Sequence, residues 1–408
     1  MKQFELLHQP ESPILVARLV LAIGSRVDPP GQRGRQQLLA GVLTRGCGEL
    51  NAEDFANKVE SFGASLRCDA GDDFLVLALK CNNDDAIFLL PLLLDMLESP
   101  SCDKDQVNLE RDLNIQTIQR MREDPFYLCH EKLRLLLFSD GPYGHDPIGI
   151  KNDLEKIEPK LLLQISKQLS ARSALLVLAG NPSLSLQEQC INRISGWTSE
   201  IEAGPPLIPE PLNNFAAVRC RTEQVVMMIG FRTVEIQNPD ALLLRILQVH
   251  LGVGMSCRLF HVIREELGLA YDIGAELITR SSDSPMIWHL SCGIDRAPEA
   301  LSAFLGEWRR LLEQPISAAE LNLAVAKIKG QEALSCETLS QRADRLAALL
   351  SYGLPKSHSE ICLKKLPHVS PAELQQAAQR LLQKPNLSVC GPASALNDLK
   401  HQWQVAMS

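Results

Sequence analysis

The stretch LGVGMSCRLFHVIREELGLAYDIGAE (251–276) decides the fold. Its glycine-rich start, its apolar residues at helical spacing and its apolar end predict a turn, a helix over 256–266 and a strand over 270–278. The segment EELGLAY (265–271) inside it parallels ESFGASL (60–66), 205 positions earlier, and further on HLSCG (289–293) parallels LALKC (77–81), 212 positions earlier. One structural unit is therefore used twice in the chain.

The order of the predicted elements supports this repeat. The first half reads as a strand over 13–27, helices over 34–46 and 51–63, strands over 64–70 and 73–81, helices over 84–98, 103–124, 126–138 and 159–170, and a strand over 173–181. The second half reads as a strand over 224–232, helices over 239–251 and 256–266, strands over 270–278 and 285–293, helices over 297–313, 317–350 and 371–383, and a strand over 387–391. We expect an α+β fold class with two homologous α/β domains, each an antiparallel sheet with helices packed on one face.

A domain boundary is predicted in the middle of the chain. The segment SEIEAGPPLIPEPL (199–212) contains four prolines and a glycine, which is typical of a linker. We therefore expect an N-terminal domain over 1–198, a linker over 199–215 and a C-terminal domain over 216–408.

The composition excludes several classes of partner. The net charge is -8 and no basic block occurs, so nucleic acid is not an expected partner. The longest apolar runs cover about 12 residues, fewer than the roughly 20 that a membrane span needs, so no membrane association is expected. The start MKQFELLHQPESPILVARL (1–19) resembles neither a signal nor a transit peptide, which favours a cytoplasmic location. Twelve cysteines without a Cys-x-x-Cys pair indicate buried, reduced thiols.

Two segments carry a resemblance to a known family. The stretch 251–276 resembles the pitrilysin-like zinc peptidases, in their processing-peptidase-like branch, whose second halves have a similar glycine-rich turn, Arg-bearing helix and Gly-x-x-Tyr. The stretch EDPFYLCHEKLRLLLFSDGPYGHDPIGI (123–150) is similar to the family segment that follows the long helix of the first half. The resemblance extends through most of both halves.

The resemblance implies a zinc site on the helix within GRQQLLAGVLTRG (34–46). Family enzymes carry His-x-x-Glu-His there, where two imidazoles hold the metal and the Glu is the general base. In this chain the three positions fall on Gln37, Ala40 and Gly41, and the position of the third ligand, on the long helix, falls on Thr117. The zinc site is therefore expected to be degenerate, with no metal or cofactor in this chain.

No other site in the sequence replaces the zinc motif. The nine histidines are all more than five positions apart, which excludes a helical pair, and no Gly-x-Ser-x-Gly segment occurs. We expect no autonomous peptidase activity. The helix is expected to be kept for packing, with Leu38, Leu39, Val42 and Leu43 as its apolar face.

The second half retains residues of another kind. The resemblance implies that Arg264 and Tyr271, seven positions apart, bind the substrate backbone and stabilise the oxyanion formed beside zinc. It also implies substrate contacts for Gly252 and Gly254 of the glycine-rich turn, and for Arg67, which stands in the edge strand where the family has Asn. On the residues alone, Arg264 complements a helix end and Tyr271 fills a strand.

These observations predict a non-catalytic, substrate-binding subunit of a heteromeric zinc metallopeptidase that acts on peptides or small unfolded polypeptides. The expected partner is a homologous subunit that contains His-x-x-Glu-His and holds the zinc, with a homodimer possible for the isolated chain. Two alternatives stay open: a structural core-type subunit in which Arg264 and Tyr271 are incidental, and a homodimeric peptide-binding module without hydrolysis.

Overall fold

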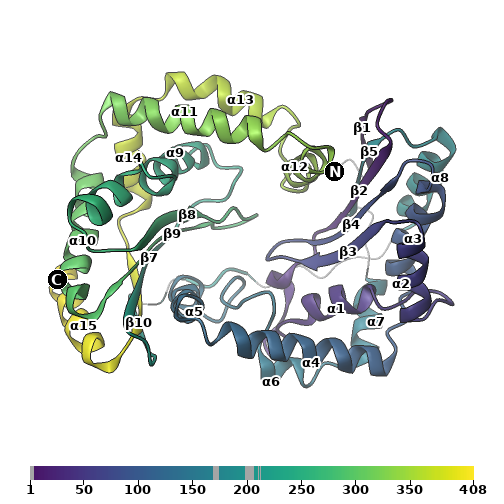
Figure 1. Ribbon diagram of the computed structural model, residues 1–408, viewed down its shortest axis with the longest axis horizontal. Coiled ribbons are helices and arrows are strands. Elements are labelled where there is room, and N and C mark those ends of the chain that lie inside the picture. The colour runs from purple at the N-terminus through teal and green to yellow at the C-terminus, as the bar shows by residue number, and fades with distance from the viewer. Residues whose placement is uncertain (1–3, 169–173, 198–205, 210, 212) are drawn as a thin grey trace. The chain divides into compact units, whose positions relative to one another are not determined.

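The computed structural model describes residues 4–168, 174–197, 206–209, 211 and 213–408 (Figure 1). Packing divides the chain into two units that are each discontinuous in sequence. The first contains Met1–Gln119, Gly141–Leu207 and Leu334–Lys356, and the second contains Arg120–Asp140, Ile208–Ala333 and Ser357–Ser408. Each unit therefore includes one short segment from the opposite half of the sequence.

Each unit is built on a five-stranded sheet with the same strand order. The first sheet runs β1 (Phe4–His8), β5 (Ala174–Gly180), β2 (Ile14–Leu21), β4 (Leu75–Asn82), β3 (Ser65–Ala70). The second runs β6 (Phe215–Arg219), β10 (Asn386–Gly391), β7 (Gln224–Arg232), β9 (Pro285–Gly293), β8 (Asp272–Leu277). The pairings β1–β5 and β6–β10 are parallel and the others antiparallel. The matching order confirms the repeat and the expected class of two α/β domains.

Most helices cover one face of their own sheet. In the first unit these are α1 (Arg35–Leu43), α2 (Ala52–Ser61), α3 (Ala86–Glu98), α4 (Lys104–Met121), α7 (Pro159–Lys167) and α8 (Leu184–Ser195), with a short α6 (Lys151–Leu154). In the second unit they are α9 (Ala241–Gly252), a π-helix (Phe260–Glu266), α10 (Ala297–Glu313), α11 (Ala318–Leu334), α14 (Pro371–Leu381) and α15 (Ala393–Met407), while α13 (His358–Lys365) has no buried residue. Each cluster of buried apolar side chains lies between this helical layer and the sheet.

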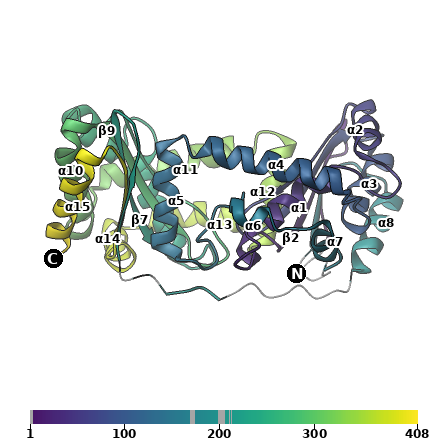
Figure 2. The ribbon, with the colours of Figure 1, turned by 90° about the horizontal axis from the view of Figure 1, so that it is seen from below.

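One helix covers the second face of each sheet, and it comes from the other half of the sequence. Helix α5 (Pro125–Phe138) lies against β10 and β7 (Figure 2). The Cys129 thiol on α5 donates a hydrogen bond to the Ser388 carbonyl at 3.2 Å. The Phe138 ring contacts the guanidinium groups of Arg232 at 5.5 Å and Arg280 at 4.7 Å from its centroid. Sequence patterning predicts α5 as a helix but not the sheet on which it packs.

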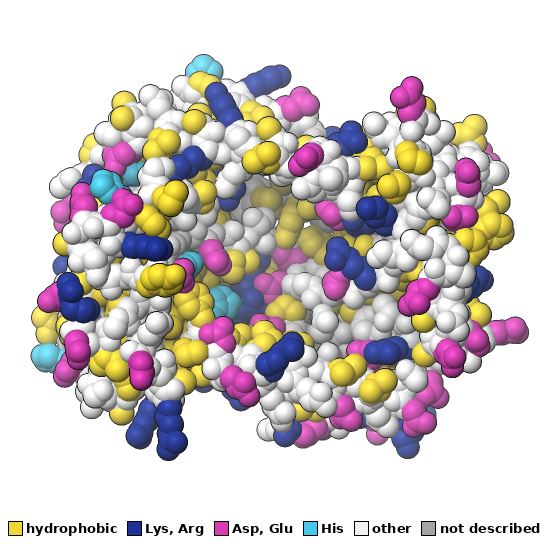
Figure 3. All heavy atoms as spheres, viewed as in Figure 1, with side chains coloured by type: hydrophobic (Ala, Val, Ile, Leu, Met, Phe, Trp, Pro, Cys, Tyr) yellow, Lys and Arg dark blue, Asp and Glu magenta, His cyan; other side chains and the backbone are white. Residues whose placement is uncertain are grey.

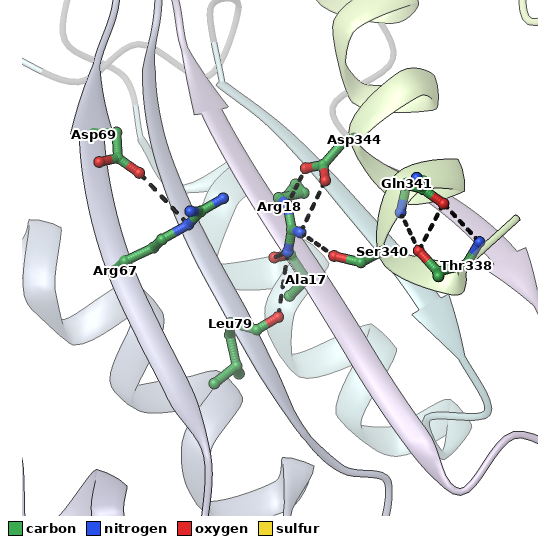
Figure 4. Close-up of polar contacts among 9 residues, drawn as sticks. All are labelled: Ala17, Arg18, Arg67, Asp69, Leu79, Thr338, Ser340, Gln341 and Asp344. Atoms are coloured by element: carbon green, nitrogen blue, oxygen red, sulfur yellow. Dashed lines mark hydrogen bonds and ion pairs between the residues drawn. The ribbon is translucent and has the colours of Figure 1, made fainter. Parts of the chain in front are cut away.

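Helix α12 (Leu339–Ser351) covers β2 and β5 in the reciprocal way. Its small buried residues Ala343 and Ala347 let it approach the sheet closely. Arg18, buried on β2, donates from Nε to Asp344 Oδ1 at 2.5 Å and from Nη2 to Ser340 at 2.7 Å (Figure 4). A buried charge of this kind needs such partners, so Arg18 fixes where α12 docks.

Several predicted boundaries are wrong. The predicted helix over 317–350 is two helices, α11 and α12, because Thr338 forms a capping box with Gln341 and starts a new helix. The strand predicted over 13–27 ends at Leu21, and Ser25–Val27 is a 3₁₀ turn. Of the predicted linker over 199–215, residues 199–205, 210 and 212 lie outside the described residues, and its last residue, Phe215, begins β6.

Two further expectations concern membranes and thiols. None of the helices in the described residues is both long and apolar enough to cross a membrane. The structure describes all twelve cysteines, and nine of them are buried, which agrees with the expectation of buried thiols.

Candidate functional site

Helix α1, where the family carries its zinc motif, is a core helix. Leu38, Leu39, Val42 and Leu43 are fully buried, which confirms the predicted apolar face. Ala40, at the position of the general base, is fully buried as well. The helix therefore keeps the packing function that its sequence predicts.

The positions of the zinc ligands offer almost no metal-binding atom. The Gln37 side chain is half-buried, and its Oε1 accepts a hydrogen bond from the Ala70 backbone amide of β3 at 3.2 Å. Ala40 and Gly41 have no side-chain donor or acceptor. Zinc sites in proteins use imidazole, thiolate or carboxylate ligands. The residues at 37, 40 and 41 do not fit a zinc ion.

A carboxylate that sequence analysis missed lies against Gly41. A Cβ atom at position 41 would overlap Oε2 of Glu110, which is buried on α4. Arg45 holds this carboxylate, with Nε donating to Glu110 Oε1 at 2.6 Å. An ion pair within the chain therefore fills the space beside Gly41. Thr117 lies two helical turns beyond Glu110, and its hydroxyl donates to the Leu113 carbonyl at 2.8 Å within α4.

The rest of the described chain offers no substitute site. Among the residues that the structure describes, no group of three or more His, Cys, Asp or Glu side chains is arranged to hold a metal ion. The clusters of charge that do occur are ion pairs such as Arg45–Glu110 and Arg258–Glu307.

In the second unit the structure brings Arg264 and Tyr271 together. Arg264 lies on the π-helix and Tyr271 immediately precedes β8. The Arg264 guanidinium carbon lies 4.9 Å from the centroid of the Tyr271 ring and 4.6 Å from that of Phe260. Stacking on two rings restricts the guanidinium while leaving its edge free to donate hydrogen bonds. Tyr271 is 77% exposed, so a ligand can reach its ring.

The other predicted substrate contacts, Gly252, Gly254 and Arg67, each have their own neighbours in the structure. Gly252 ends α9, and a Cβ there would overlap the backbone nitrogen of Ala275, so close helix–strand packing requires glycine. Gly254 has φ +76° in the turn that follows, a conformation that favours glycine. Arg67 is exposed on β3 and pairs with Asp69 at 3.5 Å (Figure 4). Substrate contact by these three residues stays a prediction.

A histidine lies close to the start of β8. Nε2 of His289 on β9 is 3.9 Å from Oδ2 of Asp272, the residue that follows Tyr271. The His289 ring also meets Phe126 of α5 edge to face, at 5.1 Å between centroids. Burial lowers the pKa of His289, while the Asp272 and Glu276 carboxylates act in the opposite direction. Sequence reasoning missed this group because His289 is isolated from other polar residues in the sequence.

Two segments of the sequence match models of one peptidase family. Residues 4–146 match the family described as "Insulinase (Peptidase family M16)", and residues 161–328 match "Peptidase M16 inactive domain". An uncharacterized zinc protease of Rickettsia bellii is 23% identical over 92% of this chain and 91% of its own length. A protein of the same description from Streptomyces coelicolor is 22% identical, over 92% of this chain and 85% of its length.

Solved structures match over nearly the whole chain. The "peptidase M16 inactive domain" from Pseudomonas fluorescens has a TM-score of 0.86 at 19% identity, with 95% of each chain covered. A protease from Helicobacter pylori has a TM-score of 0.86 at 16% identity, with 95% of this chain and 97% of that chain covered. These structures share the fold described above. On the sequence matches to both of its halves, the chain belongs to peptidase family M16, the pitrilysin-like peptidases.

Proposed function

We propose that this chain is the non-catalytic, substrate-binding subunit of a heteromeric zinc peptidase that acts on peptides or small unfolded polypeptides. One contrast carries the proposal. Protein atoms occupy the degenerate zinc site, with Gln37 bonded to Ala70 and the Arg45–Glu110 pair beside Gly41. Arg264 and Tyr271, by comparison, lie together, with Arg264 half-buried and Tyr271 exposed.

The chemistry of peptide hydrolysis explains why a partner is needed. A bound zinc ion lowers the pKa of its water to about 7 and so supplies the nucleophile. Gln37, Ala40 and Gly41 provide neither the ligands for zinc nor the general base. Arg264 and Tyr271 can donate hydrogen bonds to a peptide carbonyl and to the oxyanion that it becomes. The pair assists a reaction that only a chain with an intact His-x-x-Glu-His helix can start.

The first sheet supports peptide binding. Strand β3 lies at the edge of its sheet, and an extended peptide can add to such an edge through backbone hydrogen bonds. The exposed Arg67 and Asp69 side chains stand on this strand and contribute charge beside the docked backbone. In the second unit, Gly254 contributes a turn without a side chain, and the segment that bears Arg264 follows this turn in the sequence.

Purification from the native host tests the proposal. A tagged chain is expected to retain a second M16 chain that carries His-x-x-Glu-His, with zinc in the complex and none in the isolated tagged chain. Retention of only copies of itself together with peptides would favour the homodimeric peptide-binding module. Retention in a larger assembly that neither binds nor cuts peptides would favour the structural subunit. Stoichiometric zinc in the isolated chain would contradict the proposal.

A further inference from the structure

The glutamine at the first zinc position has an equivalent in the second unit. Gln37 on α1 accepts a hydrogen bond from the Ala70 amide, and Gln248 on α9 donates from Nε2 to the Ala275 carbonyl at 2.7 Å. Gln248 lies 211 positions after Gln37, and Ala275 lies 205 positions after Ala70, which agrees with the spacing of the repeat to within one residue. In both units a helix side chain therefore holds the backbone of the outermost strand at the same place.

The same correspondence holds for a glycine one helical turn further on. Gly41 follows Gln37 by four residues, and Gly252 follows Gln248 by four residues. In both helices a side chain at this position would meet other atoms of the chain, the Glu110 carboxylate at Gly41 and the Ala275 backbone at Gly252. The zinc helix of the first unit thus has the Gln-x-x-x-Gly pattern of the corresponding helix in the second unit.

The pairing of β3 shows which of its backbone groups face outward. In an antiparallel pair, alternate residues direct both N–H and C=O away from the neighbouring strand. The Gly71 amide donates to the Phe74 carbonyl at 2.8 Å and closes the hairpin with β4, so Ala70, Cys68 and Leu66 face the open edge. The Ala70 amide among these donates to Gln37.

At both ends of β3, a backbone amide that faces the open edge forms a hydrogen bond within the chain. At the beginning, the Ala64 amide donates to the Val59 carbonyl of α2 at 3.3 Å. At the end, Gln37 holds Ala70. Between these two points, Leu66 and Cys68 present backbone amides and carbonyls to the edge, and no other part of the described chain pairs with them.

We propose that Gln37 is a positioning residue that ends the open edge of β3 and so sets the register of a docked peptide. An extended peptide pairs with Leu66 and Cys68 and cannot take the amide of Ala70. In β8 the equivalent hydrogen bond, from Gln248, falls in the middle of the strand, at Ala275, and so divides the outer edge of that strand. The occupant of the β3 edge is an extended peptide backbone, because unpaired amides and carbonyls on an edge strand are complementary to one. This inference rests on the proposed function.

Amide hydrogen exchange tests the hydrogen bond between Gln37 and the Ala70 amide in the free chain. In Gln37→Met, which keeps the side-chain length but has no amide oxygen, the Ala70 amide is expected to exchange about 10-fold faster, the effect of losing one hydrogen bond. Gln37→Glu keeps an acceptor oxygen and should leave Ala70 protected. Gln248→Met, a matched change at the equivalent position of the other unit, should not alter the exchange at Ala70. Equal Ala70 exchange in wild type and Gln37→Met would overturn the inference.

Peptide footprints test the register. Unfolded peptides of increasing length are added, and the amides that become protected are mapped. In the wild type, protection is expected at Leu66 and Cys68, with no change at Ala70 for any length. In Gln37→Met, protection by the longer peptides should extend to Ala70. An identical footprint in both proteins would overturn the inference. If the wild type binds no peptide, the proposed function is wrong, and the exchange of the free chain still decides whether Gln37 holds Ala70.

Discussion

The carboxylate of Glu110 occupies the place where a side chain at position 41 would begin, and Arg45 holds it there. A guanidinium thus supplies the positive charge beside this carboxylate, within a space that the family uses for its zinc site. The Arg45–Glu110 pair fills the space beside Gly41. The helix persists because its other faces belong to the core.

Three glycine substitutions should differ in their effect on stability. Gly252→Ala is expected to cost about 3 kcal/mol, because the new methyl group meets the Ala275 backbone, which cannot move aside. Gly41→Ala should cost about 1 kcal/mol, since Glu110 must shift but helix propensity improves. Gly306→Ala on the open side of α10 should stabilise by about 0.5 to 1 kcal/mol. Urea unfolding of each variant measures the order, and Gly41→Ala as stable as Gly306→Ala would contradict the closed site.

The docking of α12 depends on Arg18. Asp344→Ala is expected to lower the free energy of unfolding by about 2 kcal/mol, because it removes the charged partner of a buried guanidinium while Ser340 remains. Asp344 is itself half-exposed, which keeps the loss below that of a fully buried pair. The control is Asp69→Ala, which breaks the exposed pair with Arg67 and should cost less than about 0.5 kcal/mol. Equal effects of the two changes would show that Arg18 does not anchor α12.

The isolated first half should not fold stably. A fragment of residues 1–198 lacks α12 and so exposes Val16, Val20, Leu175 and Val177 on the second face of its sheet. Fusion of residues 334–356 to its end is expected to restore cooperative unfolding and to abolish the binding of a hydrophobic dye. Cooperative unfolding of the unfused fragment, with no dye bound, would argue against the exchange of helices.

Stability should fall in mild acid because of His250. This side chain is buried beside a cavity of about 90 Å³ that Glu320 and Lys327 also line, and its Nε2 has no hydrogen-bond partner among the described residues. Burial lowers its pKa to about 4. The unfolded chain binds a proton below a pH of about 6.5 and the native chain does not, so the free energy of unfolding decreases as pH falls from 6.5 toward 4, by up to about 1.4 kcal/mol per pH unit.

A comparison of the wild type with a His250 variant separates the contribution of His250 to the pH dependence from that of the carboxylates. The unfolding free energy of wild type and of His250→Gln is measured between pH 7 and pH 4.5, and the difference between them should change with pH in favour of the variant. A difference that stays constant over this range would mean that His250 titrates alike in both states.

The sequence predicts the sheets well, because their inner strands contain continuous apolar runs, such as 174–179 and 225–229, that are buried throughout. It does not predict the exchange of α5 and α12, since an apolar helix face shows that a helix is covered and not which sheet covers it. The sequence does not predict the position of Glu110 for a related reason. Its contact with Gly41 joins residues far apart in sequence, and the signal for it is a missing side chain.

The contact between Arg264 and Tyr271 is easier to predict, because only a short turn separates the helix that carries Arg264 from the start of β8. The helix itself is a π-helix, which the sequence did not indicate. Its wider turn accompanies the stacking of Arg264 on Phe260, four residues earlier. The family resemblance thus predicts that Arg264 and Tyr271 act together, while the geometry that presents them depends on packing.

Peptide cleavage by this chain mixed with a homologous chain that carries His-x-x-Glu-His tests the central claim most directly. We predict that neither this chain nor the partner alone cuts efficiently, that the mixture cuts with a requirement for zinc, and that Arg264→Ala lowers kcat by about 10²-fold to 10³-fold, the usual effect of losing an oxyanion donor. Tyr271→Phe should also lower kcat while leaving the unfolding free energy unchanged, because the side chain is exposed. Zinc-dependent cleavage by this chain alone, or a mixture in which both variants cut like the wild type, would contradict the account.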